Sequence, residues 1–305
     1  MKKTTLFLVS LMLIFMTGCS LEPPEWAKPK ASGDVKDMKI GLSISTLNNP
    51  FFVSLKDGVV AEAAKQGIEV VVVDAQNDSA KQSNDVDDLI QQGVNALLIN
   101  PTDSSAISTV VQTANSLGIP VITLDRSAEQ GDVEALVASD NIKGGQMAAE
   151  YMVEQLGEGT KVIELEGVPG ASATRERGKG FHDVADQKLK VVAKQSADFD
   201  RTKGLNVMEN LLQGNPDVKA VFAHNDEMAL GAIEAIQSSG KDIMVIGFDG
   251  NDDALNSIKA GKLTATIAQQ PELIGQLAVQ AAKDVQQGKA VEKTIPAPLK
   301  LVIKE

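Results

Sequence analysis

Short apolar runs rich in β-branched residues alternate along the chain with segments whose apolar residues recur at helical spacing. Strands that are apolar at nearly every position are buried on both faces, which is typical of parallel sheets covered by helices. The alternation therefore predicts an α/β fold. The runs that we expect to form strands are residues 40–44, 70–73, 97–99, 121–124, 162–165, 221–223 and 244–248.

The segments between these runs are predicted to be helices. Residues 53–66 and 228–239 carry apolar side chains at the spacing of one helical face. A last helix is expected over residues 271–287, and a closing apolar run follows at 299–303. Glycines stand where helices commonly end, at Gly67, Gly93, Gly118 and Gly240.

The number of predicted strands is too large for one comfortable open sheet. Two doubly wound lobes, each with a parallel sheet, fit the pattern better, and a chain of 305 residues agrees with roughly two domains. We expect the change of lobe near Ser139-Asp140-Asn141. The last helix and the closing run could return to either lobe, and the pattern alone leaves that open.

The first residues belong to neither lobe. Two lysines precede an apolar run at residues 6–16, and Gly18 and Cys19 follow, an order typical of a secretory signal. The run is too short to span a membrane. Cys19 is the only cysteine, so it forms no internal disulfide, and its position resembles the lipidation site of bacterial lipoproteins. We expect a signal peptide over residues 1–18 and a lipid on Cys19; ordinary cleavage nearby with an incidental cysteine is the alternative.

Charge and composition limit the partners of the chain. Residues 19–36 contain several prolines and are expected to form an extended tether. The sequence has 29 basic and 41 acidic side chains, a net charge of −12, and loss of residues 1–18 leaves 27 basic side chains and −14. Such a charge opposes binding to nucleic acid. Beyond the signal, no apolar run approaches the length of a membrane span.

Polar side chains follow the predicted strands at the points where the strands end. Ligands of open α/β sheets bind outside the carboxyl ends of the strands, so two facing lobes would direct these side chains into one cleft. Helix capping is an alternative role that suits Asp74, Asp78 and Asp226. Arginine is not a helix cap and its charge is unfavourable at a helix N-terminus, so Arg126 beside Asp125 favours a ligand. The strand-end residues are Ser45, Asp74, Asn100, Asp125, Arg126, Glu166, Asn225, Asp226, Asp249 and Gln269.

Residues 45–52 place hydroxyl groups, amides and two adjacent phenylalanines between the first strand and the first helix. Pro50 suits the first turn of that helix. Rings beside hydrogen-bonding groups suit a ligand with polar edges and apolar faces, such as a sugar. From this segment alone, simple packing of the two rings is an equal alternative. Similarly, Arg175 and Arg177 could belong to a solvated helical face, or one of them could reach the cleft.

Sequence signals of nucleotide binding, metal binding and catalysis are missing. The chain has no P-loop and no complete dinucleotide fingerprint, and neither His182 nor His224 stands in a metal-ligand pair. His224 could in principle act as a catalytic base, but no serine elbow partners it. Residues 249–253 begin like a calcium loop, yet Ala254 and Ala260 occupy the positions that need glycine and glutamate. We therefore expect no metal, no cofactor and no enzymatic activity.

Several separated motifs together resemble one known family, and their common order is more specific than any single motif. They occur in the same order as in the ribose-binding proteins of bacterial ABC importers, which are periplasmic binding proteins of the sugar-binding type I. The resemblance covers the chain from residue 38 to the C-terminus. It is carried by residues 45–52, 99–103, 122–126, 175–178, 197–201, 225–231, 247–250 and 266–269.

The resemblance implies a type I periplasmic binding protein fold, with two doubly wound lobes joined by a three-strand hinge. It implies a first lobe of residues 37–139 and 270–298 and a second of residues 140–269 and 299–305, with Gln269 at the hinge. Sugar hydroxyls both donate and accept hydrogen bonds, which suits paired carboxylates, amides and guanidinium groups. The implied contacts are Ser45, Asn49, Asn100, Asp125 and Arg126 from the first lobe, Arg177, Asn225, Asp249 and Gln269 from the second, and Phe51, Phe52 and Phe199 over the apolar faces of the sugar.

The implied activity is capture of D-ribose by hinge closure and its delivery to an ABC importer permease with a cytoplasmic ATPase. The resemblance also implies a monomer tethered by the lipid on Cys19 to the outer face of the cytoplasmic membrane, in a bacterium without an outer membrane. It implies no catalysis and no nucleic acid partner.

Other functions are also consistent with the sequence. The ligand could be allose, galactose or a furanosyl signal molecule, because a fold does not fix the choice of epimer. Transcriptional repressors share this core, but they need a DNA-binding segment ahead of it. Residues 1–36 are instead predicted to be a signal peptide and a tether. An exported glycosidase would need two carboxylates across a bond, for which Asp125 and Asp249 are the candidates.

Overall fold

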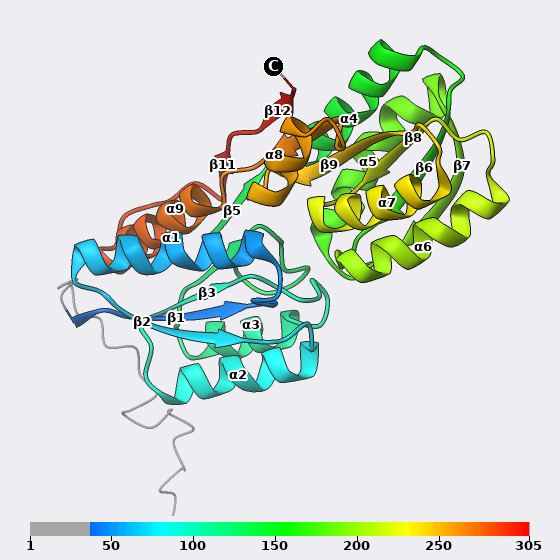
Figure 1. The fold of residues 1–305 in the computed structure, drawn as a ribbon. Helices are drawn as coiled ribbons and strands as arrows, with labels where there is room; N and C mark the ends of the chain where they lie inside the picture. Colours follow the sequence, from blue (N-terminus) through cyan, green and yellow to red (C-terminus); the bar gives the residue numbers. More distant parts are fainter. Residues whose placement is uncertain (1–36, 305) are drawn as a thin grey trace, which may run out of the picture.

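We describe residues 37–304 from a computed structural model. Two α/β lobes lie side by side, and each is built on a six-stranded sheet with helices on both faces (Figure 1). The predicted signal peptide, Cys19 and the predicted tether lie outside the described residues. The fold class expected from the sequence is confirmed.

The first sheet has the strand order β11-β5-β4-β3-β1-β2, and all of its neighbouring strands are parallel. Five of its strands come from the described chain up to Ser139, and the sixth comes from near the C-terminus. They are β1 (Lys39–Ile44), β2 (Glu69–Asp74), β3 (Ala96–Ile99), β4 (Val121–Leu124), β5 (Ala135–Ser139) and β11 (Thr294–Ala297).

The second sheet has the order β12-β10-β9-β8-β6-β7 and is parallel except at its edge, where β12 runs antiparallel to β10. The strands are β6 (Lys161–Glu166), β7 (Lys190–Ser196), β8 (Ala220–Ala223), β9 (Met244–Asp249), β10 (Ala265–Ala268) and β12 (Lys300–Ile303).

Helices on both faces of each sheet bury the strands, and neighbouring residues of one strand pack against opposite layers. Leu98 of β3 lies in one core with α1 and α9, whereas Leu97 lies in the other with α2 and α3. In the second sheet, Ile163 packs with α6 and α7, and Val162 packs with α4 and α5. The helices are α1 (Pro50–Gln66), α2 (Ser79–Gln91), α3 (Ser108–Ser116), α4 (Asn141–Leu156), α5 (Ser172–Lys188), α6 (Arg201–Gly214), α7 (Asp226–Ser239), α8 (Asp252–Lys259) and α9 (Pro271–Gln286).

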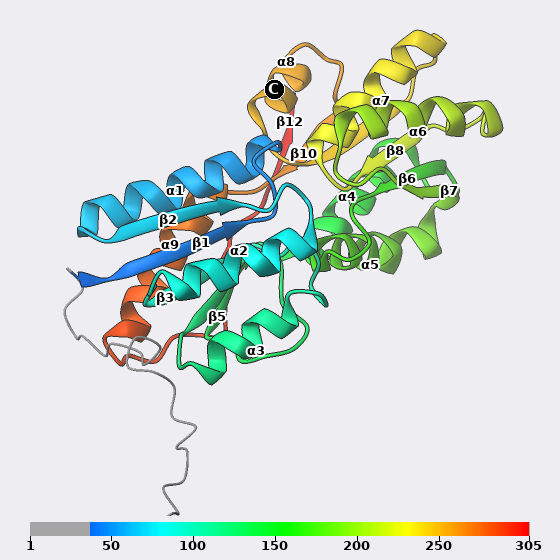
Figure 2. The same ribbon diagram turned by 90° about the horizontal axis from the view of Figure 1, so that it is seen from below.

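The chain crosses between the two sheets three times. The crossings follow β5, follow β10 and lie between β11 and β12. The second view shows these connecting segments running together between the lobes (Figure 2). The last helix, α9, returns to pack against α1. The backbones of the two helices approach so closely that a β-carbon at Gly58 or at Gly275 would overlap the partner helix.

The strands and helices expected from the sequence are confirmed, with differences at their ends. The first helix begins at Pro50, the residue predicted to suit its first turn, and the side chain of Asn49 caps it. Gly67 and Gly240 end helices in the left-handed conformation, with φ of 70° and 67°. The expected strand runs did not include β5, β7 and β11; β7 and β11 are edge strands whose residues are mostly exposed or half-buried.

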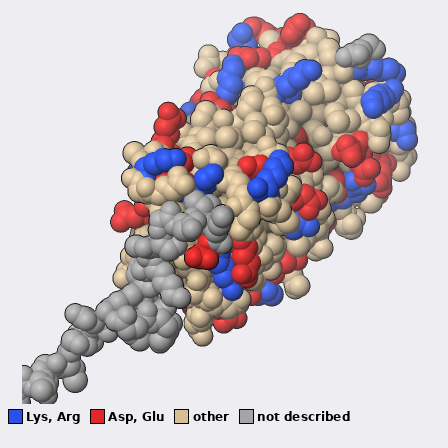
Figure 3. Space-filling view, turned by 90° about the vertical axis from the view of Figure 1, so that its left-hand side faces the viewer, with Lys and Arg blue, Asp and Glu red and all other residues tan. Residues whose placement is uncertain are grey.

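Among the described residues, no helix combines the length and the apolar character needed to cross a membrane. On the face of the molecule shown in Figure 3, acidic and basic side chains are interspersed, and neither sign forms a broad continuous region.

Candidate ligand-binding site

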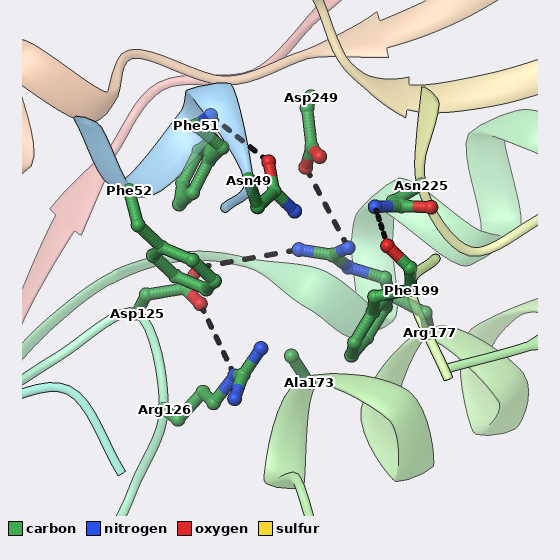
Figure 4. A pocket seen from close by; sticks show the side chains of 10 residues that line it. All are labelled: Asn49, Phe51, Phe52, Asp125, Arg126, Ala173, Arg177, Phe199, Asn225 and Asp249. Carbon is green, nitrogen blue, oxygen red and sulfur yellow. Dashed lines mark hydrogen bonds and ion pairs between the residues drawn. The ribbon is translucent and has the colours of Figure 1, made fainter. Parts of the chain in front are cut away.

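A pocket lies between the lobes at the carboxyl ends of both sheets (Figure 4). The space not filled by atoms amounts to about 220 Å³, including the part that is open to solvent. Nine of the residues predicted for the site line it, together with one that the sequence did not indicate. The lining residues are Asn49, Phe51, Phe52, Asp125, Arg126, Ala173, Arg177, Phe199, Asn225 and Asp249.

The start of α1 supplies an amide and two rings to the pocket. Asn49 is in extended conformation, and its Oδ1 accepts a hydrogen bond of 3.0 Å from the backbone N–H of Phe51. This capping bond orients the side chain, whose amide nitrogen points into the pocket (Figure 4). The rings of Phe51 and Phe52 meet edge to face, with centroids 5.3 Å apart. Both rings are buried, and both line the pocket. Packing and pocket formation are thus compatible roles for the same rings.

Asp125 and Arg126 follow β4 without an intervening helix. Asp125 has a φ of 62°, an unusual value for a residue with a β-carbon, and the backbone N–H of Arg126 donates to the carbonyl oxygen of Leu124 at 2.7 Å. This tight turn directs both side chains into the pocket. Arg126 Nη1 donates to the carbonyl oxygen of Pro101 at 3.0 Å, and its Nε lies 3.6 Å from Asp125 Oδ2.

Rings from both lobes contact the guanidinium group of Arg126. Its Cζ lies 4.9 Å from the ring centroid of Phe52 and 5.3 Å from that of Phe199. Burial lowers the pKa of Arg126 to about 10, and the charge of Asp125 acts in the opposite direction. Arg126 therefore remains charged at neutral pH and joins the first lobe to a ring of the second.

Arg177 on α5 is the charged centre of the second lobe. Its Nε donates to Asn141 Oδ1 at 2.9 Å and its Nη1 to the carbonyl oxygen of His224 at 2.6 Å. The guanidinium group also stacks on Phe248, with Cζ 3.8 Å from the ring centroid. Three neighbours thus fix the orientation of this side chain.

Carboxylates of both lobes lie beside Arg177. Asp249 Oδ1 is 3.7 Å from Nη1, and Asp125 Oδ1 is 4.0 Å from Nη2 (Figure 4). Burial raises the pKa of Asp125 above its ordinary value and that of Asp249 well above it, while the charge of Arg177 lowers both. The charge of Arg177 offsets only part of the cost of burying the two carboxylates. Asp125 and Asp249 are therefore strong acceptors for hydroxyl groups of a ligand.

Two of these buried polar groups lack a hydrogen-bond partner within residues 37–304. Asp125 Oδ1 is an acceptor without a donor, and Arg126 Nε is a donor without an acceptor. Buried polar atoms are nearly always hydrogen-bonded in proteins. A hydroxyl group both donates and accepts, so polyhydroxy ligands match this arrangement.

Phe199 and Asn225 complete the second-lobe side of the pocket. Phe199 has a φ of 60°, and a β-carbon at Gly167 would overlap its ring, so the glycine leaves room for the ring. Asn225 caps α7 by accepting from the N–H of Met228 at 2.9 Å, and its Nδ2 donates to the carbonyl oxygen of Phe199 at 3.2 Å. The two residues therefore hold each other in place.

The structure does not bring Ser45, Asn100 and Gln269 to the pocket wall, although the resemblance implied contacts for all three. Ser45 Oγ donates to Asn100 Oδ1 at 2.6 Å, and Asn100 Nδ2 donates to the carbonyl oxygen of Leu124 at 3.0 Å. These bonds join the ends of β1, β3 and β4 behind the pocket. Gln269 Nε2 donates to Asp249 Oδ1 at 2.9 Å and so supports a lining residue.

Of the three aspartates for which helix capping was the alternative role, only one caps a helix. Asp78 caps α2. Asp74 instead accepts from backbone N–H groups of loops, including that of Gln76 at 2.9 Å. Asp226 is the first residue of α7, and its carboxylate accepts from Gly250 N, Asn251 N and Thr266 Oγ1 at 2.7–2.8 Å.

The sequence did not indicate Ala173 as a lining residue, because alanine carries no polar group that would mark it. His224 is fully buried outside the pocket wall, and its Nε2 lies 2.8 Å from Glu164 Oε1. Within the described part of the chain, no three His, Cys, Asp or Glu side chains are grouped so that they could hold a metal ion.

Comparison with known proteins agrees with the fold. The family model described as "Periplasmic binding protein domain" matches residues 40–290. The chain is 72% identical over 301 residues to the ribose import binding protein RbsB of Bacillus subtilis, with 99% of each chain covered. It is 54% identical to the protein of the same name from Escherichia coli, covering 92% of this chain and 95% of that one.

A similar solved structure is the Caulobacter myo-inositol binding protein bound to myo-inositol. It is 34% identical, with a TM-score of 0.84, and the match covers 90% of this chain and 95% of that chain.

Proposed function

The chain belongs to the periplasmic binding protein family, and from this membership we propose that it captures D-ribose between its two lobes and delivers it to an ABC importer. Its relatives are substrate-binding proteins, and the chain is a binding protein rather than an enzyme. The relatives that are 72% and 54% identical carry the name of ribose import binding proteins. Asp125 and Asp249 accordingly act as hydrogen-bond acceptors here, and the glycosidase alternative is set aside.

The observation that carries the proposal is the position of Arg177 between carboxylates of opposite lobes. A ligand seated there meets acceptors and donors from both sides, while Phe51, Phe52 and Phe199 cover apolar C–H surfaces. Differential affinity for the closed arrangement is what shifts an open–closed equilibrium toward closure. A sugar that bonds to both lobes therefore drives hinge closure without any change in its own bonds.

We propose that the closing bodies are residues 37–139 with 270–298 and residues 140–269 with 299–305. The three crossings of the chain support this division, since each lies where one sheet ends and the other begins. In the same proposal the protein acts as a monomer, and the closed form is what the permease recognises.

The proposed location is the outer face of the cytoplasmic membrane, with a lipid on Cys19 as the anchor. The family is extracytoplasmic, and the position of Cys19 after the predicted signal motivates the anchor. Mass spectrometry of the mature N-terminus tests it. An unmodified N-terminus at another residue would contradict the anchor, and Cys19→Ser is expected to release the protein from membranes.

A thermal-shift screen followed by calorimetry tests the ligand. We expect D-ribose to raise the melting temperature more than allose, galactose, arabinose or myo-inositol at equal concentration. A larger shift with another sugar would identify that sugar, and not ribose, as the ligand. Myo-inositol is included because the similar Caulobacter protein was solved with it bound.

A further inference from the structure

Several contacts join the two lobes at one place outside the pocket. The loop after β3 in the first lobe meets the start of α5 in the second. Ser104 N donates to the carbonyl oxygen of Gly170 at 2.9 Å, and Ser172 N donates to Ser104 Oγ at 3.1 Å. Ser127 N of the first lobe donates to Ser172 Oγ at 2.9 Å. None of these residues lines the pocket.

Helix α5 has no side-chain cap from its own lobe. Its N-cap residue is Ala171, which makes no capping hydrogen bond. The first backbone N–H groups of a helix have no partner within the helix and need an outside acceptor. Here the acceptor for the first of them, Ser172 N, is the hydroxyl group of Ser104 in the opposite lobe. Both serines are buried, with 0% and 3% of their surface exposed.

We propose that Ser104 is a cross-lobe helix cap that forms only when the lobes close, and that it sets sugar affinity without touching the sugar. The inference rests on the proposed capture of a sugar by hinge closure. When the lobes separate, Ser172 N bonds to water, so loss of the Ser104 hydroxyl costs little in the open form. In the closed form the same loss leaves a buried N–H without an acceptor. The substitution therefore penalises closure selectively, and apparent affinity falls with the population of the closed form.

The cap acts on the helix that carries a lining residue. Arg177 lies five residues after Ser172 on α5, so closure places the cap and the guanidinium group on the same helix at the lobe boundary.

The exposed ion pair between Glu129 Oε1 and Arg175 Nη2, at 2.9 Å, also joins the lobes. Because both side chains are nearly half exposed, we expect that pair to add little.

Gly170 provides a second test, in which a side chain is enlarged at the lobe boundary instead of shortened. A β-carbon at Gly170 would overlap the carboxylate of Asp103 across the lobe boundary. The Asp103 side chain is held by the N–H groups of Ser105 and Ala106, both at 2.8 Å, so it does not move away freely. The backbone of Gly170 does not have the positive φ that requires glycine. Gly170→Ala therefore inserts a wedge that opposes closure but fits the open form.

The test compares full-length wild type, Ser104→Ala, Gly170→Ala and the control Ser238→Ala, whose hydroxyl bonds only within α7. Calorimetry gives the dissociation constant for ribose, and thermal unfolding without sugar gives the stability of the open form. We expect Ser104→Ala to weaken binding roughly 3- to 30-fold, the range for loss of a cap, with an unchanged sugar-free melting temperature. Gly170→Ala should weaken binding at least as much, and Ser238→Ala should leave it unchanged.

Unchanged affinity in Ser104→Ala would overturn the proposal. So would a fall in sugar-free stability as large as the fall in affinity, since the cap would then act in the open form. If the wild type fails to bind ribose, the proposed function falls, and the same ratios are measured with the sugar that gives the largest thermal shift. The cross-lobe cap is judged by the ratio of variant to wild type, whichever sugar is used.

Discussion

Arg177 Nη2 on the second lobe lies 4.0 Å from Asp125 Oδ1 on the first, and no hydrogen bond in the described chain satisfies that carboxylate oxygen. Opposite charges from two lobes thus approach each other at the centre of the pocket without closing a direct hydrogen bond. A sugar hydroxyl that donates to Asp125 and accepts from Arg177 would complete the link. In the proposed mechanism, the pair is what would connect closure to the presence of ligand.

Replacing Arg177 by alanine should weaken ribose binding by roughly 1.5–3 kcal/mol or more, the usual range for a hydrogen bond to a charged group. Isothermal calorimetry measures the change. Arg177→Lys keeps the charge but loses the planar fork, so it should recover only part of the affinity. Lys179→Gln, two positions further along α5 and paired with Asp183 of the same helix, is the matched control. Wild-type affinity in Arg177→Ala would remove Arg177 from the site.

Ser45→Ala should lower stability more than affinity, because Ser45 bonds to Asn100 behind the pocket. The expected loss is about 1 kcal/mol of unfolding free energy, with binding changed less than threefold. Asn49→Ser, which keeps a side-chain oxygen that can cap α1 but loses the amide nitrogen that points into the pocket, should show the reverse pattern. Urea denaturation and calorimetry on the same samples separate the two quantities. A tenfold loss of affinity in Ser45→Ala at unchanged stability would restore the direct contact that the resemblance implied.

Stability should depend on pH through a buried carboxylate shared by two histidines. Glu164 Oε2 lies 2.8 Å from His182 Nε2, and its Oε1 lies 2.8 Å from His224 Nε2. Burial alone would raise the pKa of Glu164, but the hydrogen bonds of the two histidines outweigh it and bring the pKa to about 2. The hydrogen bond to Glu164 raises the pKa of His182 to about 9, with Asp186 adding to the effect and burial opposing it.

The directions of the two pKa shifts define the pH range in which the Glu164–His182 pair stabilises the fold most. The lowered pKa of Glu164 adds stability above its unfolded value of 4.5, and that stability is lost as pH falls toward 2. The raised pKa of His182 adds stability below its unfolded value of 6.5, and that stability is lost as pH rises through 9. His182→Gln should therefore be most destabilised relative to wild type between pH 4.5 and 6.5. Urea denaturation across pH 4 to 9.5 measures it, and a constant difference would contradict the assignment.

Asp226→Asn should loosen the turn that positions Asp249. Asp226 accepts from the N–H groups of Gly250 and Asn251 and from the Thr266 hydroxyl, and burial raises its pKa to about 7. An amide has only one oxygen for these three donors, so we expect a loss of about 1–3 kcal/mol of unfolding free energy together with weaker sugar binding. Thr266→Val removes one donor and should give a smaller loss. Equal effects in the two variants would show that the backbone bonds contribute nothing.

The sequence predicted what depends on local pattern. Apolar runs located the buried strands, and polar residues after them identified Asp125, Arg126, Asn225 and Asp249 as pocket residues. The same rule also selected Asn100, because a residue at a strand end can point into the cleft or along the sheet edge. Only the spatial proximity of β1 and β4 decides that Asn100 bonds to neighbouring strand ends.

Other features had no sequence signal at all. Ala173 lines the pocket without any polar group, and Ser104 meets Ser172 across 68 positions of sequence. Both depend on how the two lobes face each other, which periodicity and capping preferences do not encode.

The threefold crossing of the chain also constrains the order in which the protein acquires its structure. The first lobe takes α9 and β11 from residues near the C-terminus, and Ile274 and Val279 of α9 belong to the core that buries α1. A growing polypeptide that has reached residue 270 still lacks α9, one of the two helices that cover one face of its first sheet. Its N-terminal half therefore stays incompletely folded until almost the whole chain has been synthesised. Deleting the last thirty-odd residues should consequently damage the lobe that contains residue 40 as well as the strand at the C-terminus.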